Sequence, residues 1–246
     1  MTRVDVPRVL AVVRKELRDY RRRRSIVAAM VVLPIIFLIQ PVVSIFVVQG
    51  GRSTDLDKYV ILPLLYLLLT PVIIPSTLAA YSVVGEREQG TLEPLLTTPL
   101  RTGEFILGKA AAVMIPTLAI SYLIFALFLA AVRLFAHSAI SSAVFHQGPV
   151  LLALFLFAPL LGGWAVVVGM AVSVRANEVR VAQQLGMLAS LPVVGVVILL
   201  AAGVIAPTFQ VALEFAAGIL AADLLALRLV SRLFNRERLV TGAKAV

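Results

Sequence analysis

The chain has 246 residues, of which 61% are apolar and 14% are charged, and its mean hydropathy is +1.02. Soluble domains are typically about 45–50% apolar and about 25% charged, so this chain has too few polar residues to cover a globule of its size. The composition therefore excludes a soluble domain and predicts that a lipid bilayer solvates most of the chain.

The formal net charge is +9. The basic residues flank apolar runs and aromatic residues do not interleave with them, so we expect membrane lipids with anionic headgroups as partners and no nucleic acid. The chain contains no cysteine, which excludes disulfides, thiolate metal sites and thiol nucleophiles.

The first expected element, residues 6–25, is an amphipathic helix that lies along the inner membrane face. Pro7 suits its first turn. The helix is either a topology signal alone or also an elbow that touches a cytosolic partner. Its apolar positions are Val9, Val13, Leu17 and Tyr20, and the arginines opposite them are Arg14, Arg18 and Arg22.

Six apolar runs are long enough to cross the hydrocarbon core, which takes about 20 helical residues. The last run qualifies although it contains Glu214, Asp223 and Arg228. We therefore expect an all-α, polytopic membrane protein with one transmembrane domain over residues 1–246. The expected spans are residues 26–48, 59–84, 110–132, 150–174, 185–206 and 211–230.

Lysine and arginine orient these spans. Nineteen of the 22 basic residues lie on one side of the predicted membrane, together with both termini and residues 85–109. By the positive-inside rule that side is the cytosol, so we expect a multi-pass protein of the cell inner (cytoplasmic) membrane with both termini cytoplasmic. The three basic residues on the other side are Arg52, Lys58 and Arg133.

Residues 85–109 are the one long polar segment between two uncharged apolar runs. Thr91 can cap a short helix, and Glu93 then falls in its first turn, where the helix dipole favours an anion. Thr102 and Glu104 begin the helix that follows and enters the membrane.

The short helix has an apolar face, formed by Leu92, Leu95 and Leu96, that is exposed to the cytosol and requires a partner. Glu86 and Glu88 precede it and offer charges for register and specificity. We predict a docking helix in this segment; the alternative is an ordinary loop whose leucines rest on the membrane or on the helical bundle.

The sequence from Gly103 to Lys109 matches the phosphate-binding spacing G-x-x-x-x-G-K. Such a loop needs Ser or Thr next to bind magnesium and a strand before it. Ala110 occupies that position, and the segment leads into a membrane helix. We therefore expect no cofactor on this chain, and ATP and Mg on a partner chain.

Acidic residues inside a span are costly and by default suggest a function. Glu214 lies near the predicted outer end of its span, where it can reach water. Asp223 lies deeper and is a possible intramembrane polar site: it could pair with Arg228, interact with another helix or line a path.

Enzymatic chemistry has little support. The two histidines, His137 and His146, have neither thiols nor clustered carboxylates beside them, so we expect no metal site. Hydrolase motifs with a serine nucleophile or a paired-histidine metal are missing from the sequence. We expect no catalytic residue.

From Glu86 the sequence reads E-R-E-Q-G-T-L-E-P-L-L-T-T-P, with Glu104 and Gly108-Lys109 beyond. This pattern resembles the membrane permease of the ABC type-2 exporter family, in which Gly-Thr-x-Glu-x-Leu-Leu, then Pro, Glu and Gly-Lys, lies between the second and third of six spans. The segment that begins at Arg14 and reads R-K-E-L is also similar to that family's N-terminal start.

The resemblance implies a coupling helix that docks on a separate ABC ATPase (nucleotide-binding) subunit, and Glu104 and Lys109 match its pattern as docking residues or as anchors of the next helix. It also implies a second permease copy, as a homodimer or a paralogous heterodimer. The docking residues that it implies are Glu86, Glu88, Gly90, Thr91, Leu92, Glu93, Leu95, Leu96 and Pro99.

The predicted function is therefore that of the permease subunit of an ATP-driven exporter, moving an apolar or amphipathic substrate such as a drug, antibiotic, lipid or ion. Export follows from the resemblance, and the apolar preference from the few charges inside the spans. The alternative is a stand-alone secondary transporter, which needs ion-coupling groups near the midplane; Asp223 is the one candidate.

Overall fold

The computed structural model describes residues 5–49, 56–81, 84–88, 90, 101–201, 204 and 208–233. Within these residues every regular element is helical. Six of the helical stretches are long and apolar enough to cross a membrane, by length and composition, which confirms the all-α, six-span prediction. They are Ile26–Val47, Val60–Glu86, Gly103–Phe135, Val150–Arg175, Val179–Val196 and Phe209–Arg228.

The helices follow one another along the described chain. The third span begins at Gly103, earlier than residue 110, because its helix begins at Thr102 as the sequence indicates. The elements are α1 (Val6–Arg22), α2 (Arg24–Gln49), α3 (Leu56–Tyr66), the 3-10 turn η1 (Leu67–Leu69), α4 (Thr70–Ala80), α5 (Val84–Glu88), α7 (Thr102–Phe135), α8 (Ser138–His146), α9 (Gly148–Arg175), α10 (Val179–Met187), the 3-10 turn η2 (Leu188–Ser190), α11 (Leu191–Ala201) and α12 (Phe209–Leu233).

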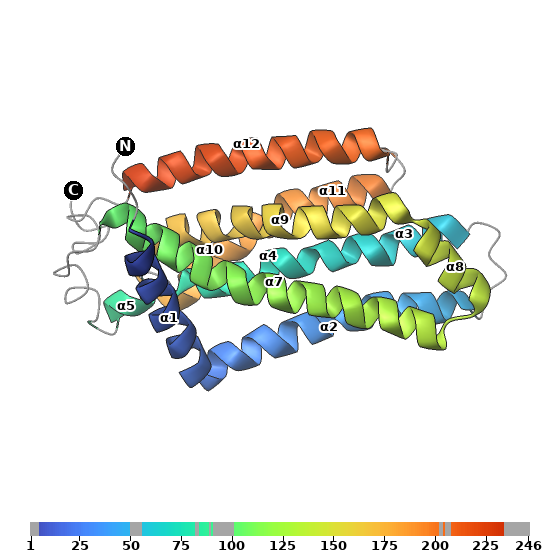
Figure 1. The fold of residues 1–246 in the computed structure, drawn as a ribbon, viewed down its shortest axis with the longest axis horizontal. Helices are drawn as coiled ribbons and strands as arrows, with labels where there is room; N and C mark the ends of the chain where they lie inside the picture. The colour runs from blue at the N-terminus through green and yellow to red at the C-terminus, as the bar shows by residue number, and fades with distance from the viewer. Residues whose placement is uncertain are drawn as a thin grey trace.

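The bundle is elongated, and its long helices run roughly along one axis (Figure 1). Helices α1 and α5 lie at one end, here named the α1 end, together with the start of α7. Helix α8 crosses the opposite end, named the α8 end, where it packs against α3 and α7. Helices α2 and α12 form two opposite edges of the bundle.

Small residues bring α4 and α9 together in the centre of the bundle. A Cβ atom added at Gly169 would lie 2.6 Å from the Cβ of Ala79, so the two backbones approach more closely than larger side chains allow. This is how helices associate in lipid, where the hydrophobic effect between helices is absent and packing drives contact. Gly169 therefore acts as a packing residue between α9 and α4.

Two prolines explain the breaks inside spans. Pro71 has no N–H to donate to the carbonyl of Leu67, and the N–H of Thr70 bonds that oxygen instead, closing the 3-10 turn η1. The same hydrogen-bond pattern recurs in the fifth span, where the N–H of Leu191 donates to the Leu188 oxygen just before Pro192. The kinks that prolines predict are thus local changes of hydrogen-bond pattern.

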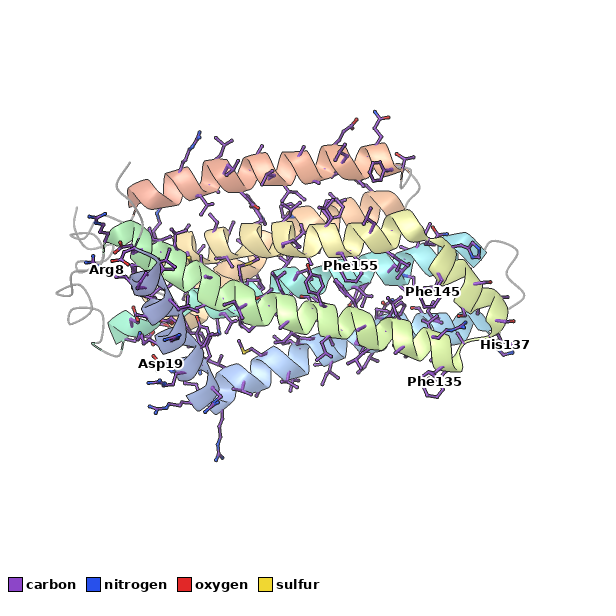
Figure 2. The ribbon with its side chains drawn as sticks, viewed as in Figure 1. Arg8, Asp19, Phe135, His137, Phe145 and Phe155 are labelled. Carbon is purple, nitrogen blue, oxygen red and sulfur yellow. The ribbon has the colours of Figure 1, made fainter. Side chains whose placement is uncertain are left out.

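The outer surface of the bundle is apolar. Phe135, at the α8 end of α7, is 68% exposed and projects away from the bundle (Figure 2). Val47 on α2 is 69% exposed. Large apolar side chains in such positions are expected where lipid replaces water as the solvent.

Candidate functional site

Helix α1 is amphipathic, as its sequence predicts, and its buried face packs against α7. Pro7 lies in the first turn, and Val13 and Tyr20 are buried. The same face carries Glu16, which is 5% exposed. A buried carboxylate on an otherwise apolar face requires a cationic partner inside the protein.

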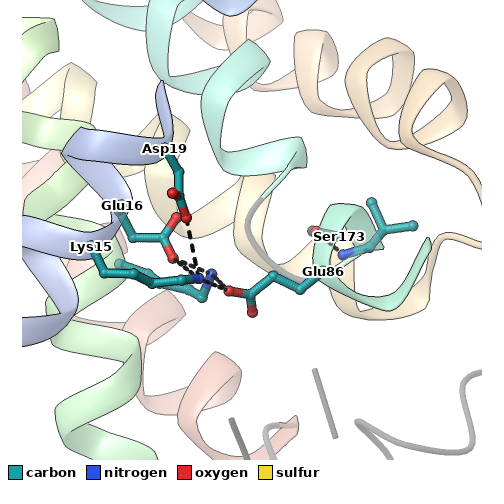
Figure 3. Close-up of polar contacts among 7 residues, drawn as sticks. Lys15, Glu16, Asp19, Glu86 and Ser173 are labelled. Atoms are coloured by element: carbon teal, nitrogen blue, oxygen red, sulfur yellow. Dashed lines mark hydrogen bonds and ion pairs between the residues drawn. The ribbon is translucent and has the colours of Figure 1, made fainter. Parts of the chain in front are cut away.

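That partner belongs to a charge cluster, defined as Lys15, Glu16, Asp19, Glu86 and Lys109. One oxygen of Glu16 lies 3.0 Å from the Lys15 Nζ and 3.1 Å from the Lys109 Nζ. One oxygen of Glu86 lies 2.5 Å from the Lys15 Nζ and 3.1 Å from the Lys109 Nζ. Figure 3 shows Lys15, Glu16, Asp19 and Glu86 converging on one point.

The cluster joins three separate elements. Lys15, Glu16 and Asp19 come from α1, Glu86 from α5 and Lys109 from α7. Lys109 is only 1% exposed, and its Nζ also lies 5.0 Å from the centre of the Phe105 ring. Removing one member of such a buried group would leave an uncompensated charge, which costs about 3–5 kcal/mol.

The cluster shifts the ionisation of its α1 members. Burial alone would raise the pKa of Glu16, but the charges of Lys109 and Lys15 outweigh it and lower that pKa. Burial likewise opposes the charge of Lys15, but Glu16 and Glu86 raise its pKa. Burial and then the Glu16 charge raise the pKa of Tyr20. Glu16 and Lys15 are therefore charged and Tyr20 neutral near pH 7.

Gly108 explains how Lys109 reaches α1. A Cβ atom added at Gly108 would lie 2.6 Å from the Val12 Cβ and 3.2 Å from the Val9 carbonyl oxygen. Helices α1 and α7 are thus in backbone contact at this glycine. Gly108 and Lys109 lie inside helix α7, where the first permits close packing and the second supplies charge to the cluster.

The start of α7 is fastened to the start of α1. Glu104, which is 1% exposed, accepts hydrogen bonds from the backbone N–H of Asp5 at 3.1 Å and of Arg101 at 3.0 Å. The second bond satisfies one of the free N–H groups at a helix N-terminus. The Arg8 guanidinium lies 3.7 Å from the same carboxylate.

Helix α5 is held by two further hydrogen bonds. The Val84 N–H donates to the Ser173 Oγ of α9 at 3.1 Å, and Glu88 accepts from the N–H of Val179, the first residue of α10, at 3.0 Å. Together with the ion pairs of Glu86, these bonds connect the short helix α5 to α1, α7, α9 and α10.

The predicted docking residues divide into two groups. Glu86 and Glu88 make the contacts just described within this chain, and Gly90 is exposed with a φ of 66°, a conformation that favours glycine. The docking role implied for these three stays a prediction. The remaining docking residues lie outside the described part of the chain: Thr91, Leu92, Glu93, Leu95, Leu96 and Pro99.

Sequence reasoning did not pair Lys15 and Glu16 with Glu86 and Lys109. The available signal was a short motif with both charge signs at residues 14–17 and a second at residues 86–109, in a chain with few charges. Opposite charges in two such motifs are candidates for a buried pair, because isolated charges are costly next to apolar spans.

Asp223 lies on α12 against α9. It is 7% exposed, and its Oδ2 would lie 3.1 Å from a Cβ added at Gly163. Asp223 thus packs closely against α9, and the roles considered from the sequence stay predictions. Its other oxygen, Oδ1, has no hydrogen-bond partner within the described residues.

Metal-binding groups are the remaining kind of site. Among the described residues, no group of three or more His, Cys, Asp or Glu side chains is placed to hold a metal ion. His137 precedes α8 and His146 is its last residue, and the His146 Nδ1 lies 2.6 Å from the Ser142 carbonyl oxygen.

Comparison with known proteins identifies the class. Residues 13–179 match the family described as ABC-2 family transporter protein, so the chain belongs to that family. The matched residues span the charge cluster, and the resemblance seen in the sequence is confirmed. With its six candidate spans, the chain is a multi-pass membrane protein of this family.

Individual relatives match a shorter stretch. The chain is 37% identical over 73 residues to the "Probable multidrug ABC transporter permease YbhR" of Escherichia coli strain K12, and equally to the protein of that name in Escherichia coli O157:H7. The match covers 29% of this chain and 20% of each relative.

Proposed function

We propose that this chain is the permease subunit of an ATP-driven ABC exporter, and that its residues 91–99 dock on a separate ATPase subunit. ATP and Mg bind that partner, and a second permease copy, identical or paralogous, completes the transport path. Membership of the ABC-2 family supports the class. The charge cluster supports the mechanism.

The cluster holds both sides of the docking segment. Helix α5 ends at Glu88 and α7 begins at Thr102, so residues 91–99 connect two elements that Glu86 and Lys109 fasten to α1. Buried ion pairs of this kind lose much energy when they separate. A push on the segment would therefore move α1, α5 and the start of α7 together.

The proposed cycle begins when ATP closes the ATPase pair. The docking segment follows the ATPase, and α7 tilts with it because α1 prevents independent movement of the α7 start. The contact of Glu88 with α10 extends the movement to the fifth span. The spans then change from an inward-facing to an outward-facing arrangement.

An apolar or amphipathic substrate fits the few charges within the spans. The Escherichia coli relatives are described as probable multidrug permeases, which supports a drug-like compound over a polyanion. Export is the direction implied by the family resemblance.

Co-purification with the ABC ATPase encoded nearest to this chain tests the docking role. The Leu95→Asp/Leu96→Asp variant would place two charges on the predicted apolar face, so we expect loss of association and of ATP-dependent transport. The Thr97→Asp/Thr98→Asp variant adds the same charges beyond that face and serves as the control. Unchanged association in the leucine variant would reject the docking role.

Asp223 favours one second candidate, a stand-alone secondary transporter, because a buried acid within a span is a feature of ion-coupled carriers. Transport by the lone chain in proteoliposomes, driven by an ion gradient without ATP and abolished in Asp223→Asn, would support it. The absence of such transport would reject this candidate.

A further inference from the structure

A cavity of about 620 Å³ lies between α9, α11 and α12. Its volume falls within the range of about 300–1,000 Å³ that is typical of small-molecule sites. On α12 its lining extends from Val211 to Ala222 and stops one residue short of Asp223. The cavity therefore begins where the contact between α12 and Gly163 ends, and continues toward the α8 end.

A glycine enlarges this cavity without serving helix packing. A Cβ atom added at Gly218, on the α12 wall, would meet no atom within 4 Å. The glycines of α9 behave differently, since Gly162, Gly163 and Gly169 each contact a neighbouring helix. Glycine inside a helix is destabilising relative to alanine, and at Gly218 no close helix contact offsets that cost.

The walls are apolar and aromatic, with one charge. Phe157, Trp164 and Phe215 contribute rings, and Glu214 is the single charged side chain among the described residues that line the cavity. The Gln210 amide donates to Glu214 at 3.0 Å and orients the carboxylate. Aromatic faces attract cations, and an acid within a span favours a positive partner.

We propose that this cavity binds an amphipathic organic monocation, whose apolar groups lie among the aromatic rings and whose charge faces Glu214. The proposal rests on the proposed function in one respect, because such a compound would be the transported substrate. Binding itself needs neither ATP nor a partner subunit, so it can be measured on this chain alone.

The chain supplies its own reporter. Trp164 lines the cavity and is the single tryptophan of the sequence, so its fluorescence responds to an occupant. The probe is tetraphenylphosphonium, a lipophilic cation, titrated into the purified full-length chain in a neutral detergent. Tetraphenylborate has nearly the same shape and the opposite charge. We expect saturable quenching by the cation and at least tenfold weaker binding of the anion.

Two variants locate the site. Gly218→Leu adds a large side chain at a wall position where an added Cβ meets no atom within 4 Å, and it is expected to weaken binding of the cation at least tenfold. Gly195→Leu is the matched control: Gly195 on α11 also has no atom within 4 Å of an added Cβ, and it does not line the cavity. We expect this control to bind the cation as the unaltered chain does.

Glu214→Gln tests the charge without changing the shape. The side chain is exposed and glutamine is nearly isosteric, so folding is expected to be unaffected. The cation should bind about tenfold more weakly, a change that corresponds to about 1.4 kcal/mol, and the preference over tetraphenylborate should disappear.

Three results would overturn the proposal: no saturable quenching, equal loss in Gly195→Leu and Gly218→Leu, or unaltered cation preference in Glu214→Gln. A phospholipid that co-purifies with the chain and is displaced only in Gly218→Leu would also reject it, in favour of a lipid site. If the chain binds the cation but does not associate with the ATPase, the proposed function is rejected and the cation site is not.

Discussion

The two ends of the molecule are built on opposite principles. At the α1 end, Lys109, Glu16 and Glu86 are buried beside the partly exposed Lys15, and Gly108 brings two helices into backbone contact. Around α12, Gly218 faces open space and a cavity lies between α9, α11 and α12. The first region resists separation of its elements, whereas the second leaves space for an occupant. Such a contrast would suit a protein in which one end transmits force and the other accommodates a ligand.

The largest expected effect comes from removing the buried lysine. Lys109→Met keeps the length of the side chain but removes a buried cation that lies 3.1 Å from both Glu16 and Glu86, so we expect a loss of about 3–5 kcal/mol in unfolding free energy. Chemical or thermal unfolding in detergent would measure it. The double variant Lys109→Met/Glu16→Gln restores the charge balance and should recover part of the loss. A Lys109→Met protein as stable as the original would contradict the importance of the cluster.

Overpacking the helix contact should have a smaller effect. Gly108→Ala places a methyl group 2.6 Å from the Val12 Cβ, and we expect a loss of about 1–3 kcal/mol as α1 shifts away. Gly103→Ala is the matched control on the same helix, because nothing lies within 4 Å of its added Cβ. Equal effects of the two glycine variants would refute the close contact.

Acid should loosen the charge cluster. The folded-state pKa of Glu16 is below its ordinary value of 4.5, so its contribution is fully present above pH 4.5 and is lost as pH falls through the folded pKa. Each unit of lowering corresponds to about 1.4 kcal/mol. The pKa of Lys15 is raised above 10.5, so its contribution is lost only as pH rises beyond that value. Melting temperature measured against pH should fall less steeply in Glu16→Gln below pH 4.5.

The smallest effects are expected from alanine substitutions at Gly163 on α9 and Gly218 on α12. Gly163→Ala places a methyl group 3.1 Å from the Asp223 carboxylate, which can rotate away, so we expect a loss of less than about 1 kcal/mol. Gly218→Ala meets no neighbour and should stabilise the helix by up to about 1 kcal/mol. A lower melting temperature for Gly163→Ala and a higher one for Gly218→Ala would sharpen the contrast. Equal destabilisation by the two substitutions would contradict the open space beside Gly218.

Much of the fold could be predicted because its signals are local. Length and hydropathy located six spans, and Thr102 with Glu104 located the start of α7. The register of the 3-10 turns follows from a missing N–H at Pro71 and Pro192. Helix α7 extends from Thr102 through Lys109 into the expected third span, so Lys109 lies inside a continuous helix and its charge is balanced by distant partners.

The candidate site was only partly predictable. The motif around Glu86 marked the region, but the contacts of Glu86 join residues 71 positions apart, and those of Lys109 join residues 93 positions apart. No periodicity in the sequence connects such positions. Pairing depends on which helices pack together, and at Gly108 that depends on the absence of a single Cβ atom.

The sequence by itself determined that this chain is embedded in a bilayer, crosses it with helices and carries the polar segment of its family. These features could be predicted because the length of an apolar run and a short motif are properties of neighbouring residues. Tertiary structure decided that the lysines and glutamates of α1, α5 and α7 form one cluster and that a cavity lies between α9, α11 and α12. These features arise from the close approach or separation of helix backbones, which small residues permit and distant partners complete.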